Sequence, residues 1–149
     1  MIRTNKFNEY ELSTDKSRIN HATVFRFLHS SYWAEGIPQE TVSKSIEHSL
    51  VFGVYFGQEQ IGFARVITDR ATFAYLADVF IAPEHRGAGL GKALMQFIMD
   101  DPNVQGLRRF VLATRDAHGL YAKYGFTPLA QPDRFMEIRN ADVYRAKSS

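Results

Sequence analysis

The sequence contains no cysteine, so it offers no disulfide framework, no thiolate metal site and no cysteine nucleophile. It also lacks long apolar runs, and none of its segments approaches the ~20 residues that a transmembrane helix needs. The charged N-terminus has no apolar stretch of the kind found in signal peptides. Repeats and Gly/Ser linkers are absent as well. We therefore expect a single domain over residues 1–149, located in the cytoplasm and without a membrane partner.

Basic and acidic residues are also nearly balanced in number. The chain has 18 Lys and Arg against 16 Asp and Glu, a net charge of +2 at pH 7. Such a mild balance argues against a nucleic-acid partner, whose binding protein would carry clustered basic residues. With 149 residues and 45% hydrophobic residues, the chain is long and apolar enough to form a core without disulfides or metals.

The first half of the chain predicts two helices followed by an antiparallel meander. Apolar residues at helical spacing indicate a helix over residues 20–32, and Pro38 is placed to begin a second one. Aliphatic and aromatic runs separated by turn residues then predict strands. These strands are expected at residues 50–56, 61–68 and 72–81, with a short earlier strand at residues 10–13.

The second half predicts one parallel pairing. An amphipathic helix beginning at Leu90 is followed by a strand at residues 109–113, so this strand should return parallel to the third strand of the meander. A short helix over residues 118–124 ends at Gly125. Final strands are expected at Phe126 and at residues 135–139. The resulting fold class is α+β, with a mixed, mostly antiparallel sheet flanked by helices.

A glycine-rich loop joins the long strand to the amphipathic helix. It reads Arg86-Gly87-Ala88-Gly89-Leu90-Gly91. Free N–H groups at the start of a helix carry partial positive charge, and glycines let phosphate oxygens approach them. Arg86 adds a cation with planar donors. We interpret the loop as a cradle for a pyrophosphate, the alternative being a turn that only connects strand and helix.

Two common phosphate loops do not match this segment. A P-loop needs a hydroxyl residue after Gly91-Lys92, where this chain has Ala93, and Arg86 occupies the position of its first glycine. A dinucleotide-binding loop has the spacing G-x-G-x-x-G within parallel strands. Here the spacing is G-x-G-x-G and the preceding strands are expected to be antiparallel, so both interpretations fail.

Two segments resemble the GCN5-related N-acetyltransferase (GNAT) superfamily, whose members transfer acetyl from acetyl-CoA to an amine. The segment from Asp78 through the glycine loop is similar to the family's Q/R-x-x-G-x-G/A pyrophosphate motif, and Leu120-Tyr121-Ala122-Lys123-Tyr124-Gly125-Phe126 is similar to its L-Y-x-K-x-G-F segment. The chain looks most like the small bacterial members. The resemblance implies a GNAT fold in which two central strands splay apart to open a slot for acetyl-CoA.

The resemblance also assigns donor-binding residues. Backbone groups of Val79, Phe80 and Ile81 would pair with the pantetheine arm, and the N–H of Val79 would polarise the thioester carbonyl. The backbone of the loop would hold the pyrophosphate through Arg86, Gly87, Ala88, Gly89, Leu90, Gly91 and Lys92. Many relatives carry Asn near Thr114, where it contacts the cofactor, so Thr114 is the candidate here. Asp116 is expected to cap the short helix.

Tyr121 is implied to be the general acid that protonates the departing thiolate. A phenol has a pKa of about 10 and a thiol one of about 8.5, so this transfer is mildly uphill. The structural alternative is an interior tyrosine that packs its ring and donates one hydrogen bond.

Asp78 lies on the strand just before the donor-binding stretch. It is a candidate base for the amine or an anchor for a cationic substrate, and an ion pair with Arg65 on the neighbouring strand is the alternative. Arg65 is a further candidate for the substrate site. Tyr32, Trp33 and Glu35 lie between the first two helices, where relatives cover the acceptor. They suit an amine through cation–π contact and charge, or they only cap the core.

These residues predict an acetyl-CoA-dependent N-acetyltransferase acting on a primary amine of a small molecule. Other acceptors are a protein Lys or N-terminus, and other functions are an acyl-CoA sensor or a nucleotide phosphate-binding domain. The histidines have no metal-ligand spacing, so no metal is expected. Family members often dimerise, which makes a homodimer an expectation.

Overall fold

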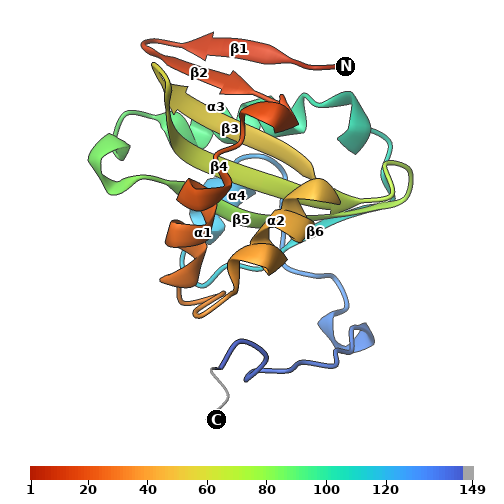
Figure 1. Ribbon diagram of the computed structural model, residues 1–149. Helices are drawn as coiled ribbons and strands as arrows, with labels where there is room; N and C mark the ends of the chain where they lie inside the picture. Colours follow the sequence, from red (N-terminus) through yellow and green to blue (C-terminus); the bar gives the residue numbers. More distant parts are fainter. Residues whose placement is uncertain (146–149) are drawn as a thin grey trace.

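The structure is a computed structural model that describes residues 1–145. Its centre is a six-stranded sheet in which the strands follow one another in chain order (Figure 1). The strands are β1 (Thr4–Phe7), β2 (Tyr10–Ser13), β3 (Leu50–Phe56), β4 (Glu59–Thr68), β5 (Phe73–Ile81) and β6 (Arg109–Leu112). All neighbouring strands are antiparallel except β5 and β6, which run parallel. The expected mixed, mostly antiparallel sheet is confirmed.

Four α-helices cover the two faces of this sheet. They are α1 (His21–His29), α2 (Gln39–Glu47), α3 (Leu90–Met99) and α4 (His118–Ala122). Asn20 caps α1 by accepting the N–H of Thr23, and Pro38 precedes the first residue of α2. In Figure 1, α1 and α2 lie in front of the sheet, and α3 lies behind it as the crossover between β5 and β6.

Side-chain alternation along the strands builds a core on each face. Val51 of β3 and Phe63 of β4 pack with α1 and α2. Phe52 of β3 and Ala64 of β4 point the other way and pack with α3. Because successive strand residues face opposite sides, two apolar neighbours serve two different cores. Within residues 1–145, the structure contains no helix with the length and apolar character of a membrane span.

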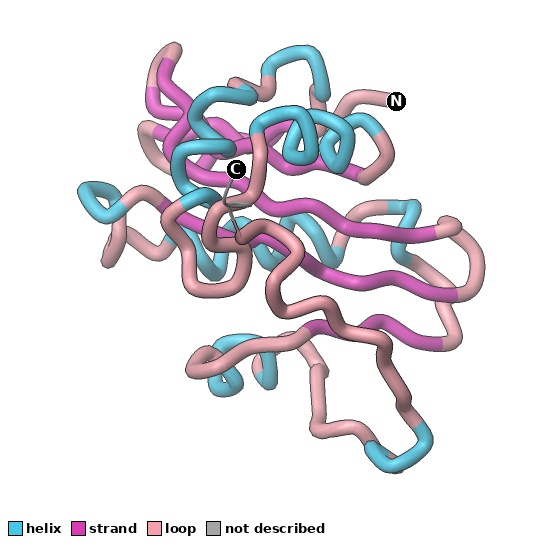
Figure 2. Tube along the Cα trace, turned by 60° about the horizontal axis from the view of Figure 1, so that its bottom comes forward, coloured by secondary structure: helices cyan, strands magenta, loops and turns pink. Residues whose placement is uncertain are grey.

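Strands β5 and β6 pair along only part of their length. The register runs from Phe73 opposite Arg109 to Leu76 opposite Leu112. Beyond this point β6 ends, whereas β5 continues to Ile81 along β4 alone. The tube in Figure 2 shows the chain after β6 diverging from the sheet. This is the expected splay, and it opens the sheet beside the second half of β5.

The strands expected after α4 are wrong. Phe126 follows the α4 turn, where its N–H donates to the Tyr121 carbonyl at 3.3 Å, and residues 135–139 form no strand. Residues 127–145 leave the body as a wide loop with one 3-10 turn at Pro132–Arg134 (Figures 1 and 2). A strand needs a partner, and here the segment has none. The structure also contains β1, which the sequence pattern did not indicate.

The buried Tyr55 should make the stability of the fold depend on pH in the alkaline range. Its side chain is 3% exposed and its hydroxyl has no partner among the described residues, so burial raises the pKa of Tyr55 to about 12. In the unfolded chain the pKa is about 10. Between pH 10 and 12 the unfolded state therefore loses this proton first, and the free energy of unfolding should fall by about 2–3 kcal/mol.

We expect Tyr55→Phe to flatten this alkaline decline in urea unfolding measured from pH 7 to 11.5. At pH 7 the variant should be at least as stable as the parent protein, because an unpartnered buried hydroxyl is removed. Tyr75→Phe, at a less buried position of β5, is the control that keeps the decline. An unchanged decline in Tyr55→Phe would contradict the assignment.

Candidate active site

A β-bulge in β5 places Asp78. Arg65 pairs with Ala77 and Phe63 with Phe80, so Asp78 and Val79 together face the single residue between Arg65 and Phe63. Asp78 has a φ of 56°, in the left-handed region that Asp tolerates better than most residues. A bulge leaves part of the hydrogen-bonding ladder unpaired and redirects side chains.

The bulge also reverses the alternation of β5. Before it, Ala74 and Leu76 pack on the α3 face, whereas after it Val79 and Ile81 do so. The bulge thus absorbs one extra residue, so both ends of the strand still contribute to the same core while Asp78 turns out of the ladder.

A cavity of about 530 Å³ lies where β5 and β6 separate. The residues expected in the site that line it are Tyr32, Trp33, Arg65, Asp78, Val79, Thr114 and Tyr121. They come from the α1–α2 connection, from β4 and β5, from the segment between β6 and α4, and from α4 itself. The structure therefore brings the acceptor, base and acid candidates into one space of the size that small-molecule sites have.

Both carboxylate oxygens of Asp78 are engaged. The Trp33 indole N–H donates to Oδ1 at 2.8 Å, and the Arg65 Nε–H donates to Oδ2 at 2.6 Å. Arg65 donates in addition to the Ser49 hydroxyl at 3.2 Å. The ion pair considered as the alternative for Asp78 is therefore present, and its two side chains are largely buried. The hydrogen bond from Trp33 to the paired Asp78 fixes the position of the Trp33 ring over the cavity.

Tyr121 lies across the cavity in α4. Burial raises the pKa of Tyr121 above its ordinary value of 10, and the negative charges that Tyr32 and Asp116 carry when ionised raise it further. The phenol consequently keeps its proton at neutral pH, as a general acid must. Its ring packs edge-on against Phe126, at a centroid distance of 6.1 Å.

The glycine loop lies outside this cavity, next to the far end of β5. The N–H of Arg86 donates to the Pro83 carbonyl at 3.3 Å and that of Ala93 to Gly89 at 3.1 Å. Between them, the N–H groups of residues 87–92 have no acceptor in the described part of the chain. Gly87 and Gly89 have φ values of 84° and 82°, which only glycine adopts readily. The loop thus offers a run of free donors at the start of α3.

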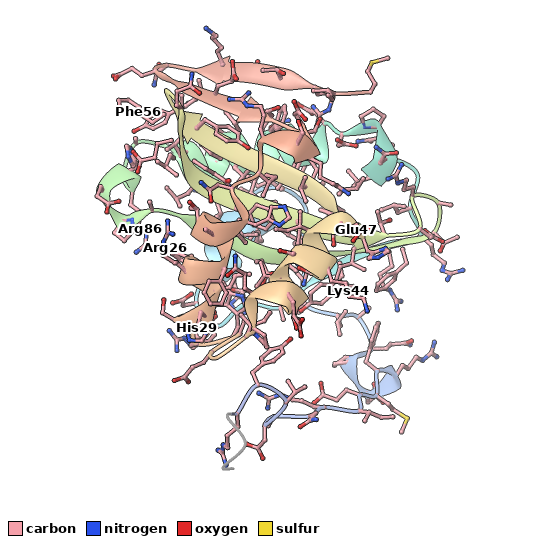
Figure 3. All side chains as sticks on the ribbon, viewed as in Figure 1. Arg26, His29, Lys44, Glu47, Phe56 and Arg86 are labelled. Carbon is pink, nitrogen blue, oxygen red and sulfur yellow. The ribbon has the colours of Figure 1, made fainter. Side chains whose placement is uncertain are left out.

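Side chains hold this loop in place. The Arg86 Nε–H donates to the Ile81 carbonyl at 3.0 Å, and Figure 3 shows Arg86 at the edge of the molecule in the loop after β5. His85 bonds to the Tyr10 hydroxyl at 2.8 Å. The Tyr124 hydroxyl donates to the Lys92 carbonyl at 2.9 Å, which ties α4 to the first turn of α3. The helix that carries Tyr121 is thereby fixed relative to the loop.

The prediction that Asp116 caps α4 is wrong. Ala117 takes the N-cap position of this helix, and no side chain caps it there. The Thr114 hydroxyl accepts the N–H of Ala117 at 3.0 Å, so Thr114 stabilises the approach to α4. Asp116 is exposed and lines the cavity instead.

Several residues that line the cavity were not among the candidates from the sequence. Tyr75 and Ala77 project from β5, and Tyr144 reaches the cavity from the segment after α4. Alternation along the strand would have indicated Tyr75, but no local pattern signals Tyr144. Arg115 also lines the cavity, and its guanidinium lies 3.9 Å from the centre of the Tyr32 ring. Glu35 faces a neighbouring pocket. Residues 1–145 contain no group of three or more potential metal ligands.

Comparison with known proteins identifies the architecture. Residues 47–128, more than half of the chain, match the family model described as "Acetyltransferase (GNAT) domain". The chain belongs to the GNAT family. It is an acetyl-CoA-dependent N-acetyltransferase, as the two sequence motifs predicted.

Individual relatives agree with this assignment. A Gibberella zeae protein named "putative acetyltransferase" is 32% identical, with 77% of each chain covered. The crystal structure of a "putative acetyltransferase" of the GNAT family from Xanthomonas campestris pv. campestris is 51% identical. It superposes with a TM-score of 0.90, covering 92% of this chain and 97% of that one. An acetyltransferase structure "with acetyl-CoA" from Clostridium acetobutylicum shares the fold at 15% identity, with a TM-score of 0.62 over 93% and 96% of the two chains.

The residues of the GNAT loop fit acetyl-CoA as the donor. The free N–H groups of residues 87–92 suit a diphosphate, and a Cβ at Gly87 would meet no atom within 4 Å, so the outer side of the loop is open. No side chain of the described chain caps the start of α3. The unused donors and the left-handed glycines are therefore accounted for by one ligand class.

Gly89→Ala should damage both the fold and donor binding. The new Cβ would suffer the left-handed φ and lie 3.4 Å from the Phe7 ring, so we expect a loss of about 1 kcal/mol in the free energy of unfolding. The distorted loop should also bind CoA at least tenfold more weakly by calorimetry. Gly57→Ala, in the β3–β4 turn at a φ of 60°, is the matched control. It should lose similar stability and keep CoA affinity, and equal losses of affinity in both variants would refute the cradle.

Proposed function

We propose that this GNAT enzyme transfers the acetyl group of acetyl-CoA to the primary amine of a small molecule by direct attack, with Tyr121 as the general acid. The observation that carries the proposal is the cavity itself. Tyr121, the bulge at Asp78 and Val79, and an aromatic wall of Tyr32 and Trp33 all line one space of about 530 Å³.

The donor is held by main-chain groups in this proposal. The N–H groups of residues 87–92 bind the diphosphate, and the backbone of Val79, Phe80 and Ile81 pairs with the pantetheine arm beside the open length of β5. Support comes from the register, because β5 has no β6 partner beyond Leu76. The thioester then reaches the cavity, where the N–H of Val79 at the bulge donates to its carbonyl oxygen and stabilises the oxyanion.

The amine attacks the thioester carbon as its lone pair forms the new C–N bond. The C–S bond breaks, and Tyr121 gives its proton to the leaving thiolate. The nitrogen loses one proton to a base, and Tyr121 regains its own from solvent. The raised pKa of Tyr121 supports this role, because a phenol that stays protonated is available as an acid over the whole neutral range.

The contacts of Asp78 support an anchoring role more strongly than a basic one. Its two oxygens already accept hydrogen bonds from Trp33 and Arg65, so taking a proton from the amine would compete with the ion pair. Two carboxylates, Asp78 and Asp116, and two guanidinium groups, Arg65 and Arg115, line the cavity, and the exposed Asp116 forms no ion pair within residues 1–145. Asp116 therefore has a free carboxylate for an ammonium group, and Trp33 adds an aromatic face for it, whereas the Tyr32 ring already contacts the Arg115 guanidinium. A small cationic amine fits these walls.

Tyr121→Phe should lower kcat with acetyl-CoA by about 10²–10⁴-fold, the range for loss of a general acid. The variant should retain CoA affinity, since the loop donors remain. Release of free thiol with a panel of small amines measures turnover, and calorimetry measures binding. Tyr55→Phe, at a buried tyrosine of β3 that does not line the cavity, is the control. A sensor without catalysis would release no thiol with any amine, and unchanged turnover in Tyr121→Phe would contradict the acid role.

The Asp78→Asn variant distinguishes a role of Asp78 in anchoring the cationic amine from a role as the general base. Asn keeps an oxygen for the Trp33 N–H and tolerates the left-handed φ, but it removes the charge opposite Arg65. For an anchor we expect KM for the amine to rise about tenfold or more while kcat changes less. A loss of 10²-fold or more in kcat at saturating amine would instead establish Asp78 as the base. Unfolding by urea is measured in parallel, because the unpaired Arg65 should lower stability.

A further inference from the structure

The charged groups that line the cavity differ in whether they already have a partner. Asp78 and Arg65 form a largely buried ion pair, so their charges compensate each other. Arg115 and Asp116 line the same cavity, but both are exposed, and neither forms an ion pair within residues 1–145. The cavity therefore presents one cation and one anion that a ligand can bind.

The Arg115 side chain is held in position by the Tyr32 ring. The guanidinium carbon lies 3.9 Å from the centre of this ring, which is a cation–π contact. A contact of this kind restricts the side chain but gives its N–H groups no acceptor. A guanidinium group binds a carboxylate through two parallel hydrogen bonds, and less entropy is lost when the side chain is already fixed. Arg115 is therefore prepared to bind an acidic group.

The position of Arg115 favours the acceptor over the donor as the source of this acidic group. Tyr32 and Arg115 both line the cavity, and they come from the α1–α2 connection and from the segment between β6 and α4. The donor phosphates have a separate set of partners in the proposed function. These are the free N–H groups of residues 87–92, which lie outside the cavity.

Asp116 lies close to the proposed general acid. Burial is the main reason that the pKa of Tyr121 is raised, and the charges of Tyr32 and Asp116 raise it further. Because that effect acts at short range, the Asp116 carboxylate is near the Tyr121 phenol in the cavity that both line. An ammonium group paired with Asp116 is thus held near the point where the thioester is attacked in the proposed reaction.

A plain amine would use only one of these two charges, because it would leave Arg115 without an anionic partner. We propose that the acceptor is an amine that also carries a carboxylate, an amino acid in the broad sense, and that Arg115 binds this carboxylate. The inference rests on the proposed acetyl transfer and names the substrate class of that reaction. Arg115 then determines specificity, since its charge favours acceptors with the acidic group over those without it.

Pairs of acids and amides test this substrate class. The ω-amino acids from glycine to aminohexanoate and the α-amino acids of proteins are each compared with the corresponding amide, by release of free thiol from acetyl-CoA. We expect at least one acid to have a kcat/KM about 10–100-fold above that of its amide, as for a hydrogen bond between charged groups. Arg115→Gln should reduce this ratio to about one, because the carboxylate loses its partner.

Arg109→Gln is the matched control for this variant. The Arg109 guanidinium lies 4.8 Å from the centre of the Phe135 ring, in a contact of the same kind, but Arg109 does not line the cavity. This variant should keep the parent ratio of acid to amide. A parent enzyme that prefers no acid over its amide would overturn the inference and leave acetyl transfer to amines in place. Equal losses for acid and amide in Arg115→Gln would also overturn it, because Arg115 would then only support the Tyr32 wall.

Calorimetry distinguishes these outcomes from a failure of the proposed function. The protein saturated with CoA, which has no acetyl group to transfer, is titrated with the same acids and amides. Tighter binding of an acid than of its amide, lost in Arg115→Gln, would support the site even without thiol release, and only the acetyl transfer would then be contradicted. A loss of CoA affinity in Arg115→Gln would instead assign Arg115 to the donor and overturn the inference. Circular dichroism establishes that both variants are folded.

Discussion

The separation of β5 from β6 is the constraint on which the rest of the site depends. The two strands share four residue pairs and then part, leaving the end of β5 with a neighbour on one side only. The cavity lies at this point, and the glycine loop follows at the end of β5. A sheet in which β6 stayed paired to β5 as far as Ile81 would have neither this cavity nor an unpaired edge along the second half of β5.

The polar residues of the cavity stabilise one another before any substrate is present. Asp78 bonds to Trp33 and Arg65, and Arg65 bonds to Ser49. A buried carboxylate needs such partners, because an unpaired charge would destabilise the fold. The network also joins the α1–α2 connection to β4 and β5. The shape of the cavity and the stability of the sheet therefore depend on the same contacts.

Much of this arrangement was predictable because the relevant signals are local. Strand β3 has the expected bounds, and α3 begins at Leu90, where the glycine loop ends and apolar residues recur at helical spacing. The family motifs then predicted a diphosphate-binding role for the loop and a general-acid role for Tyr121, and both roles stay predictions. The bulge at Asp78 was not predictable from alternation, because the extra residue is stabilised by contacts with Trp33 and Arg65 that lie far away in sequence.

The incorrect predictions also concern features that depend on contacts between residues far apart in sequence. Residues 135–139 have the composition of a strand, but a strand forms only where it pairs with another, and within residues 1–145 this segment pairs with none, although β6 ends the sheet with an open edge. Asp116 is a good capping residue type, yet the Thr114 hydroxyl takes the N–H at the start of α4. Tyr144 lines the cavity because the irregular segment of residues 127–145 returns to it, and no hydrophobic periodicity in the sequence predicts that path.

The reversal of alternation in β5 bears on how this strand can change over time. Deleting Asp78 would restore an even ladder with Val79 opposite Ala64, so Val79 and Ile81 would still face the core that they now fill. The deletion would remove only the carboxylate that Trp33 and Arg65 bond. The core therefore tolerates β5 with or without its extra residue, and the residue is retained for the side chain that it presents to the cavity.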